Sequence, residues 1–307
     1  MAAPTQSARA KRHRSTNAAE RSPAVRRTLL VVLGLNAIVA LIKVIIGVRT
    51  GALTVLGAAL ESGLDMLNNV IGVMLVDVAG RAPDEDHPYG HDKFETLGAI
   101  GIVGFLSISC FELLREGVTS LATMRSNPSH HRIESIDIGV IALTLIVNAF
   151  VVSYERRRGK ELESAFLMAD AAHTGSDILV TLMAIASLGL SRLGGGQWLD
   201  AVLAITVALI IARSGFQILR QSIPILVDER AINADDLRSV VLGVPNVLDV
   251  RNVRSRSTAS GQLFAEVTIV VTGAMPVDRA HHLADAVEMA IEREFGASQV
   301  TVHIEPA

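Results

Sequence analysis

The sequence predicts an all-α membrane domain of six transmembrane helices, followed by a C-terminal α+β domain in the cytoplasm. Half of the 307 residues are hydrophobic and only 19% are charged, which is too apolar for an ordinary soluble protein. Several stretches before residue 221 reach the length of about 20 apolar residues that crosses a bilayer. Beyond that point the composition becomes that of a water-soluble domain.

The chain divides into three expected regions. Residues 1–27 form a basic arm rich in Ala, Ser, Thr, Arg and Lys, which we expect to be disordered and cytoplasmic. Residues 28–221 form the membrane domain and residues 222–307 the cytoplasmic domain. The apolar run after the arm is longer than the hydrophobic core of a signal peptide. The arm is therefore not expected to be a cleaved signal peptide. It either attracts anionic lipid or only sets the topology.

The apolar segments lie at about residues 28–48, 52–80, 95–122, 135–154, 164–191 and 198–220. With these six segments, the basic stretches of the chain all fall on one side of the bilayer. They are the arm, residues 81–93, residues 156–160 and Arg220. Because positive charge stays inside, both termini are expected in the cytoplasm of a multi-pass protein, with a bacterial cytoplasmic membrane as its expected location. The same placement of Arg and Lys leaves no separate basic patch for nucleic acid.

The C-terminal domain is expected to follow the order αββαβ. Its helices are predicted at 233–242 and 276–295, and its strands at 247–256, 263–271 and 299–304, from the 3.6-residue and two-residue hydrophobic periods. Such a pattern is typical of one sheet covered by two helices. A unit this small buries little surface alone, so we expect it to mediate a homodimer and to regulate the membrane domain.

Ionisable residues interrupt two of the apolar segments. Glu61 and Asp65 lie in the second segment, and Asp170, His173 and Asp177 in the fifth. Each costs roughly 2.5–3.5 kcal/mol on insertion scales, so such groups mark a site or a pathway. Both Glu61/Asp65 and His173/Asp177 are i,i+4 pairs, which share a helical face.

Two facing helices would then offer one imidazole and three carboxylates to a divalent cation. The single cysteine, Cys110, excludes a disulfide framework and a Cys-ligated zinc site. The alternative is that these side chains only hydrogen-bond across helices, as Asn68, Asn69, Ser62 and Ser176 can. Two matched pairs favour a cation or protons, because grouped carboxylates repel one another.

A second candidate metal site lies in the connection after the second segment. His87 and His91 are again an i,i+4 pair, preceded by Asp84, and such a set is ordinary for zinc. The alternative is a loop that only positions the third helix, since Pro88 restricts the residue before it. Elsewhere, Lys43 in the first segment is expected to extend outward toward the membrane surface.

Four motifs resemble the cation diffusion facilitator family over nearly the whole chain after the arm. They are TGAL at 50–53 leading to ALESGLD at 59–65, DHPYGHDKFE at 86–95, ADAAHTGSD at 169–177, and VHIEP at 302–306. The resemblance implies a homodimeric exporter of divalent metal, driven by counter-movement of protons, with a metallochaperone-like C-terminal domain. It implies a transporter rather than an enzyme.

The resemblance also places the transport site at Glu61, Asp65, His173 and Asp177. Zn²⁺ is the first expected substrate, followed by iron, manganese, cobalt and cadmium. The family usually has His or Asp where Glu61 stands.

In the C-terminal domain, Arg251 and Thr268 stand where relatives often carry metal-binding His. A C-terminal metal set would then consist of His281, His303 and Glu305.

Two other functions remain open from the residues alone. A membrane-embedded metal-dependent hydrolase would also need His and carboxylates, together with an open coordination position and a general base. The sequence contains no HExxH-type motif. A metal sensor or passive channel would bind the cation without coupling it to protons.

Overall fold

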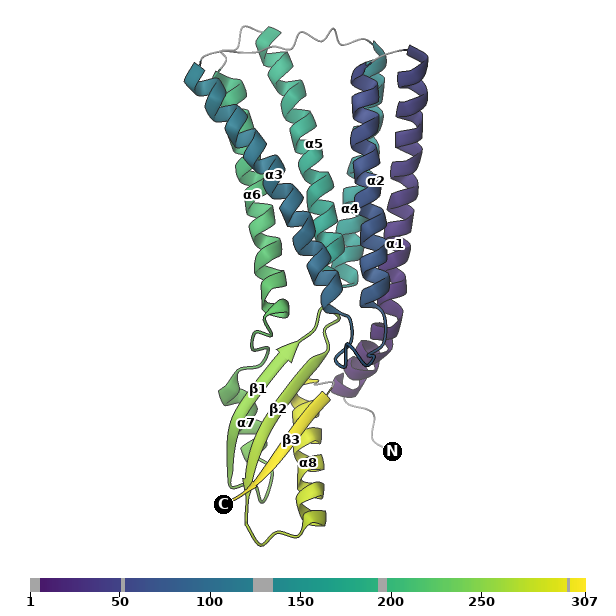
Figure 1. The fold of residues 1–307 in the computed structure, drawn as a ribbon. Coiled ribbons are helices and arrows are strands. Elements are labelled where there is room, and N and C mark those ends of the chain that lie inside the picture. Colours follow the sequence, from purple (N-terminus) through teal and green to yellow (C-terminus); the bar gives the residue numbers. More distant parts are fainter. Residues whose placement is uncertain (1–5, 51–52, 124–134, 193–197, 297–298) are drawn as a thin grey trace. The chain divides into compact units, whose positions relative to one another are not determined.

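The computed structural model describes residues 6–50, 53–123, 135–192, 198–296 and 299–307 (Figure 1). It contains two compact units. One comprises residues 22–222 and holds the helical bundle. The other comprises residues 223–307 and the first 21 residues.

The bundle consists of α1 (Gln6–Thr50), α2 (Leu53–Ala79), α3 (Lys93–Thr123), α4 (Ser135–Glu161), α5 (Ala165–Arg192) and α6 (Trp198–Leu226). Within the described residues, every one of these helices except α5 is long and apolar enough to cross a membrane. The exception carries Asp170, His173 and Asp177 in its first half, which lowers its hydropathy. The all-α membrane domain expected from the sequence is confirmed.

Three helix boundaries differ from the expected ones. Helix α1 begins at Gln6, inside the arm that we expected to be disordered, because an Ala- and Arg-rich segment has high helix propensity. Helix α4 continues through the basic stretch to Glu161. Helix α6 passes Pro224 and ends at Leu226, more than one turn beyond the predicted segment.

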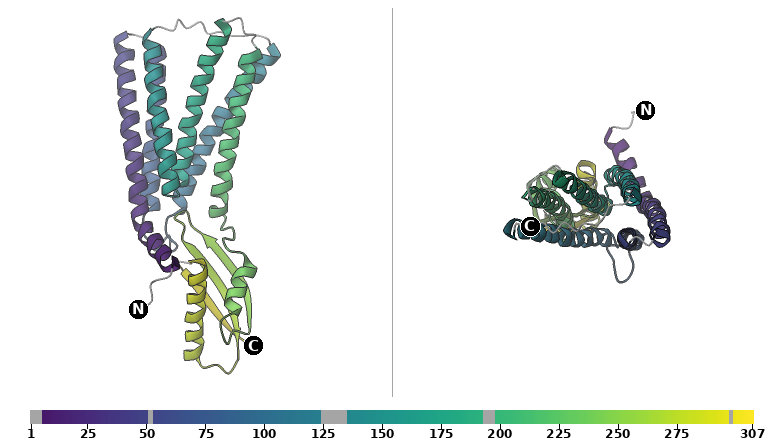
Figure 2. Two further views of the ribbon diagram at one scale, coloured as in Figure 1. Left: turned by 180° about the vertical axis from the view of Figure 1, so that it is seen from behind. Right: turned by 90° about the horizontal axis from the view of Figure 1, so that it is seen from above.

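Helix α5 packs against α3 and α4, in the middle of the bundle (Figures 1 and 2). Phe166 in its first turn is 1% exposed and lies against Gly72 of α2 and Gly98 of α3, where any Cβ atom would collide with the ring. These two glycines let the start of α5 dock between α2 and α3.

The turn between α4 and α5 is held by hydrogen bonds at both ends. The Leu162 N–H donates to the Arg158 carbonyl at 2.9 Å. Ser164 Oγ accepts from the Leu167 N–H at 3.2 Å, which caps the helix start, and donates to Glu95 Oε1 of α3 at 2.6 Å. The first turns of α5 are therefore fixed in place.

The C-terminal unit contains α7 (Ala234–Leu242), β1 (Asp249–Ser257), β2 (Leu263–Val271), α8 (Val277–Phe295) and β3 (Gln299–Pro306). The sheet order is β1-β2-β3, with β1 antiparallel and β3 parallel to β2. The two helices pack on one face of the sheet, where Leu237 and Val287 are fully buried. The expected αββαβ order is confirmed.

Candidate metal sites

The structure brings Asp65 of α2 together with His173 and Asp177 of α5. One ligand atom from each lies within 4.8 Å of the others, and His173 Nε2 is 3.8 Å from Asp65 Oδ1. A zinc ion binds each ligand at about 2.0–2.2 Å, so two ligands of one ion lie within roughly 4.4 Å of each other. The three side chains are therefore close to the spacing that a single ion requires.

Local hydrogen bonds satisfy the backbone around these three residues. Asn69 Nδ2 donates to the Asp65 carbonyl at 2.9 Å, and Ser176 Oγ donates to the His173 carbonyl at 2.6 Å. Asn69 and Ser176 thus bond within their own helices, whereas Asn68 and Ser62 bond across helices to Asp170 and Lys43. The carboxylates and the imidazole remain directed at one another.

Glu61 lies one helical turn before Asp65 on α2, as its spacing predicts. Its side chain lies outside the part of the chain that the structure describes. Its place as a fourth ligand therefore stays a prediction.

A small polar cavity of about 40 Å³ adjoins two of the three residues, Asp65 and Asp177. Asp65 and Asp177 line it together with Asn36 and Lys43 of α1 and Asn148 of α4. This volume holds a water molecule with polar partners. Residues of four helices thus line a polar cavity beside the site that has room for water.

Lys43 is 4% exposed, so the expectation that it extends outward is wrong. Its ammonium donates to Ser62 Oγ at 2.7 Å and to the Ala58 carbonyl at 3.3 Å. These acceptors on α2 replace the water that it would find at the membrane surface. The amino group of Lys43 therefore lies beside the site, in a residue that lines the cavity.

The second candidate site, in the α2–α3 loop, brings together Asp84, His87 and His91. Their ligand atoms also lie within 4.8 Å of one another, with His87 Nδ1 and His91 Nε2 each 3.3 Å from an Asp84 carboxylate oxygen. The Gly90 N–H donates to the His87 carbonyl at 2.9 Å. Pro88 favours this turn, and Gly90 adopts a φ of 87° that other residues avoid.

Asp84 is prepared to act as an ionised ligand. The backbone N–H of His87 donates to its Oδ1 at 2.7 Å and holds the pKa of this carboxyl below its usual value. His91 is 5% exposed, and its Nδ1 has no hydrogen-bond partner among the described residues. The loop thus offers an exposed carboxylate, an exposed imidazole and a buried imidazole.

The structure does not gather His281, His303 and Glu305 within one protomer. His281 lies on α8, with Nε2 4.0 Å from Asp285 Oδ2. His303 and Glu305 lie on β3 with Nε2 3.8 Å from Oε1. Because side chains alternate along a strand and Val302 and Ile304 pack toward the helices, His303 and Glu305 face the other side of the sheet from α8. Their joint role in metal binding stays a prediction.

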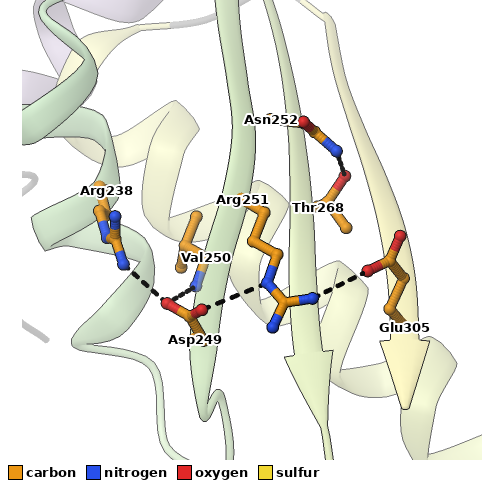
Figure 3. A network of polar contacts seen from close by, with 7 residues as sticks. All are labelled: Arg238, Asp249, Val250, Arg251, Asn252, Thr268 and Glu305. Carbon is orange, nitrogen blue, oxygen red and sulfur yellow. Dashed lines mark hydrogen bonds and ion pairs between the residues drawn. The ribbon is translucent and has the colours of Figure 1, made fainter. Parts of the chain in front are cut away.

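Arginine side chains neutralise the acids on that open face of the sheet (Figure 3). Arg251 lies 3.6 Å from Glu305 and 3.4 Å from Asp249, which also pairs with Arg238 at 2.7 Å. The Val250 N–H, followed by these arginines, holds the pKa of Asp249 below its usual value. On adjacent strands of the sheet, Arg251 of β1 lies opposite Thr268 of β2, and Thr268 lies opposite His303 of β3. A guanidinium therefore binds the carboxylate that a metal would use.

Sequence reasoning missed Glu155, which lies between the predicted fourth segment (135–154) and the basic stretch at 156–160. This side chain is 0% exposed and interacts with Asp170 of α5, which is 2% exposed and accepts from Asn68 Nδ2 at 3.0 Å. The signal was the i, i+4, i+8 spacing of Val151, Glu155 and Gly159, all buried against the interior. The neighbouring arginines obscured this pattern.

Two family models together match nearly all of the chain after the arm. The cation efflux transmembrane domain matches residues 29–227, and the cation efflux protein cytoplasmic domain matches residues 230–307. Both metal-site candidates of the bundle lie within the first match.

Curated relatives match over almost their full length. The cation-efflux pump FieF of Serratia proteamaculans (strain 568) is 28% identical over 286 residues, which are 92% of this chain and 93% of the relative. FieF of Salmonella paratyphi A (strain ATCC 9150 / SARB42) is 26% identical over 284 residues, with the same two coverages.

Two of the solved structures that match this chain cover about a quarter of it. A structure titled "Mode of Action of a Putative Zinc Transporter CzrB" is 31% identical and covers 24% of this chain and 90% of its own, with a TM-score of 0.23. The structure "MamM-CTD 215-293" is 24% identical and covers 24% of this chain and 92% of its own, with a TM-score of 0.23.

Proposed function

The chain belongs to the cation efflux family, and from that premise we propose that it exports divalent metal ions from the cytoplasm in exchange for protons. The family consists of multi-pass membrane transporters with a cytoplasmic C-terminal domain, and not of enzymes. A metal-dependent hydrolase is therefore set aside.

The observation that carries the proposal is the convergence of Asp65, His173 and Asp177 from two helices inside the bundle. Two carboxylates and an imidazole match the ligand preferences of zinc and of neighbouring transition metals. Glu61, one turn from Asp65, supplies the fourth ligand in this proposal. The polar cavity beside Asp65 and Asp177 has room for water, which in this proposal hydrates an ion that enters or leaves.

Proton exchange follows from the chemistry of these ligands. A metal binds ionised carboxylates and neutral imidazole, so binding releases protons and protonation releases metal. Binding from the cytoplasm and release on the other side then moves metal outward and protons inward. His173 titrates near physiological pH in model peptides, which suits it to carry one of these protons.

We further propose that two copies of the chain assemble through the C-terminal domain, and that the Asp84, His87 and His91 loop regulates transport. Because Asp84 and His87 are exposed in the loop between α2 and α3, in this proposal the loop binds metal without forming part of the pathway. Zinc is the first proposed substrate, with iron, manganese, cobalt and cadmium behind it.

The test is metal transport by the purified full chain in proteoliposomes, with several divalent ions in parallel and with or without an imposed pH gradient. We expect the gradient to drive zinc accumulation against its own concentration gradient. Transport that only dissipates a zinc gradient would show a passive channel. Tight binding without transport would show a sensor.

The selectivity of the site depends on Glu61 in this proposal. Replacing it by His adds a second nitrogen ligand, which favours zinc over manganese and iron, whereas an oxygen-rich set discriminates less. We expect Glu61→His to raise the ratio of zinc to manganese transport, and Glu61→Asp to change it less. An equal ratio in all three proteins would place metal selection elsewhere.

A further inference from the structure

A second pair of ionisable side chains lies in the bundle, outside the proposed transport site. Glu155 is near the end of α4 and Asp170 near the start of α5, at 0% and 2% exposure. Their carboxyl groups interact directly across the two packed helices. Asn68 of α2 donates one hydrogen bond to Asp170 Oδ1 at 3.0 Å.

The remaining oxygens of the pair have no hydrogen-bond donor in the part of the chain that the structure describes. Both Glu155 oxygens and Asp170 Oδ2 are buried without a partner. Two ionised carboxylates in contact, away from water, cannot both remain charged. A buried cation or a proton must therefore lie between them.

A proton fits this position better than a metal ion. A divalent ion takes four or more ligands, and hard ions retain several waters. Here two carboxyl groups and one amide are enclosed with almost no solvent-exposed surface. One proton converts a repelling pair into a carboxylic acid that donates an O–H···O hydrogen bond to the carboxylate beside it.

We propose that Glu155 and Asp170 together hold one proton that is exchanged for the transported metal. This inference rests on the proposed metal–proton exchange and assigns part of it to a site one helical turn from the metal ligands. Neither residue is a metal ligand in this scheme.

The position of Asp170 couples the pair to the transport site. It precedes His173 by three residues on α5, and its bonded partner Asn68 follows Asp65 by three residues on α2. Both Asp65 and His173 act electrostatically on Asp170. A divalent ion at the transport site therefore stabilises the state in which both Glu155 and Asp170 are ionised. The pair then loses its proton.

Other charged groups also lie on the neighbouring helices. Glu95 of α3 accepts from Ser164, and Glu161, farther along α4, pairs with Arg157 and Arg158 at 3.0 and 2.7 Å. The guanidinium of Arg156 lies near Gly175.

The proton has a short way out. Successive helices alternate in direction, so the α4–α5 turn lies at the end of the bundle where α6 leads into the cytoplasmic domain. When metal binds, the O–H bond of the pair breaks and the proton passes to water at that end. After metal release, the pair takes up a proton again.

The experiment counts protons released when zinc binds to the full-length protein. Zinc is added to the detergent-solubilised chain in weakly buffered solution, and released protons and bound zinc are measured together. The variants are Glu155→Gln and Asp170→Asn, which keep the shape and remove one acid, and Glu155→Asp, which keeps the acid. Glu161→Gln removes an exposed acid of the same helix as a matched control.

We expect Glu155→Gln and Asp170→Asn to release about one proton fewer per bound zinc, while zinc stoichiometry is unchanged. Glu155→Asp and Glu161→Gln should release as many protons as the wild type. In infrared difference spectra, the carbonyl band of a protonated carboxylic acid should disappear when zinc binds to the wild type and be absent in Glu155→Gln.

Three results would overturn the inference. One is unchanged proton release in both amide variants, and another is a wild-type infrared spectrum without the carboxylic acid band. The third is the loss of one bound zinc per protomer in Glu155→Gln, which would identify a metal site. A wild type that transports no metal, or that transports without a response to pH, would instead contradict the proposed function.

Discussion

The helical bundle and the C-terminal domain each gather acids and histidines, but they neutralise them differently. In the bundle, the imidazole of His173 lies 3.8 Å from Asp65. On the sheet of the C-terminal domain, the guanidinium of Arg251 lies between Asp249 and Glu305. A proton can leave an imidazole near neutral pH, whereas arginine stays charged.

The site in the bundle can therefore exchange one cation for another, whereas the acids of the C-terminal domain are already paired with a permanent cation. Loss of the imidazole proton leaves a free nitrogen and two carboxylates, which together attract a metal ion. The Arg251 side chain cannot leave Glu305 without unpairing a carboxylate. We therefore expect the bundle to carry the transported ion and the C-terminal domain to bind fewer ions than relatives with histidines at these positions.

The largest expected effect comes from removing a carboxylate of the bundle site. Asp65→Ala or Asp177→Ala should lower zinc transport in proteoliposomes by at least about 100-fold, because loss of groups that only support a ligand already costs 10–100-fold. Bound zinc measured by equilibrium dialysis should fall in parallel.

The matched control for this prediction is Asp77→Ala, which removes an exposed acid of the same helix that pairs with Arg26 at 2.9 Å. It should transport at nearly the wild-type rate. Wild-type zinc binding in the Asp65 and Asp177 variants would contradict the site assignment.

Replacing Arg251 should instead increase the amount of zinc that the protein binds. Arg251→His replaces the permanent cation by an imidazole in register with Thr268 and His303. With His303 and Glu305 this makes a three-ligand set, so calorimetry on the full chain should detect about one additional zinc ion per protomer. Arg293→His on α8 is the control. The comparison between the two regions would fail if Arg251→His bound no more zinc than the control.

A smaller effect is expected at the loop site. Replacing His87 and His91 together by Ala should raise the zinc concentration for half-maximal transport by roughly fivefold or more, as expected for a regulatory coupling, and should leave transport measurable. Asp86→Asn, an exposed acid of the same loop, should behave like the wild type. Complete loss of transport in the double variant would place the loop on the pathway.

The smallest effect is a pH dependence of the C-terminal domain. Because the folded-state pKa of Asp249 lies below its usual value, its ionised form stabilises the fold. That contribution is fully present above about pH 4 and is lost as pH falls through the lowered pKa.

Hydrogen exchange of the β1 amides in the intact protein measures this contribution. Asp249→Asn should expose these amides faster than the wild type at neutral pH, and the difference should shrink in acid. Asp278→Asn on α8 is the control. A difference that persists or grows in acid would contradict the assigned cause.

Much of the architecture could be predicted from the sequence because the relevant signals are local. The hydrophobic segments gave all six bundle helices, and the two-residue and 3.6-residue periods gave the αββαβ order. The pairs Glu61/Asp65 and His173/Asp177 needed only the geometry of a helix. The loop set Asp84, His87 and His91 could be predicted because its residues lie close together in the sequence.

What the sequence alone determined is therefore which residues share a helical face or a strand face, since helix and strand periods fix this. The tertiary structure decided which faces meet and which charges find partners. It buried Lys43 against Ser62, brought Glu155 to Asp170 across α4 and α5, and placed Arg251 against Glu305. Those contacts join residues that are far apart in the chain or on different elements, and the energy of a charge depends on the partner and the water around it. No periodicity along the chain encodes that environment.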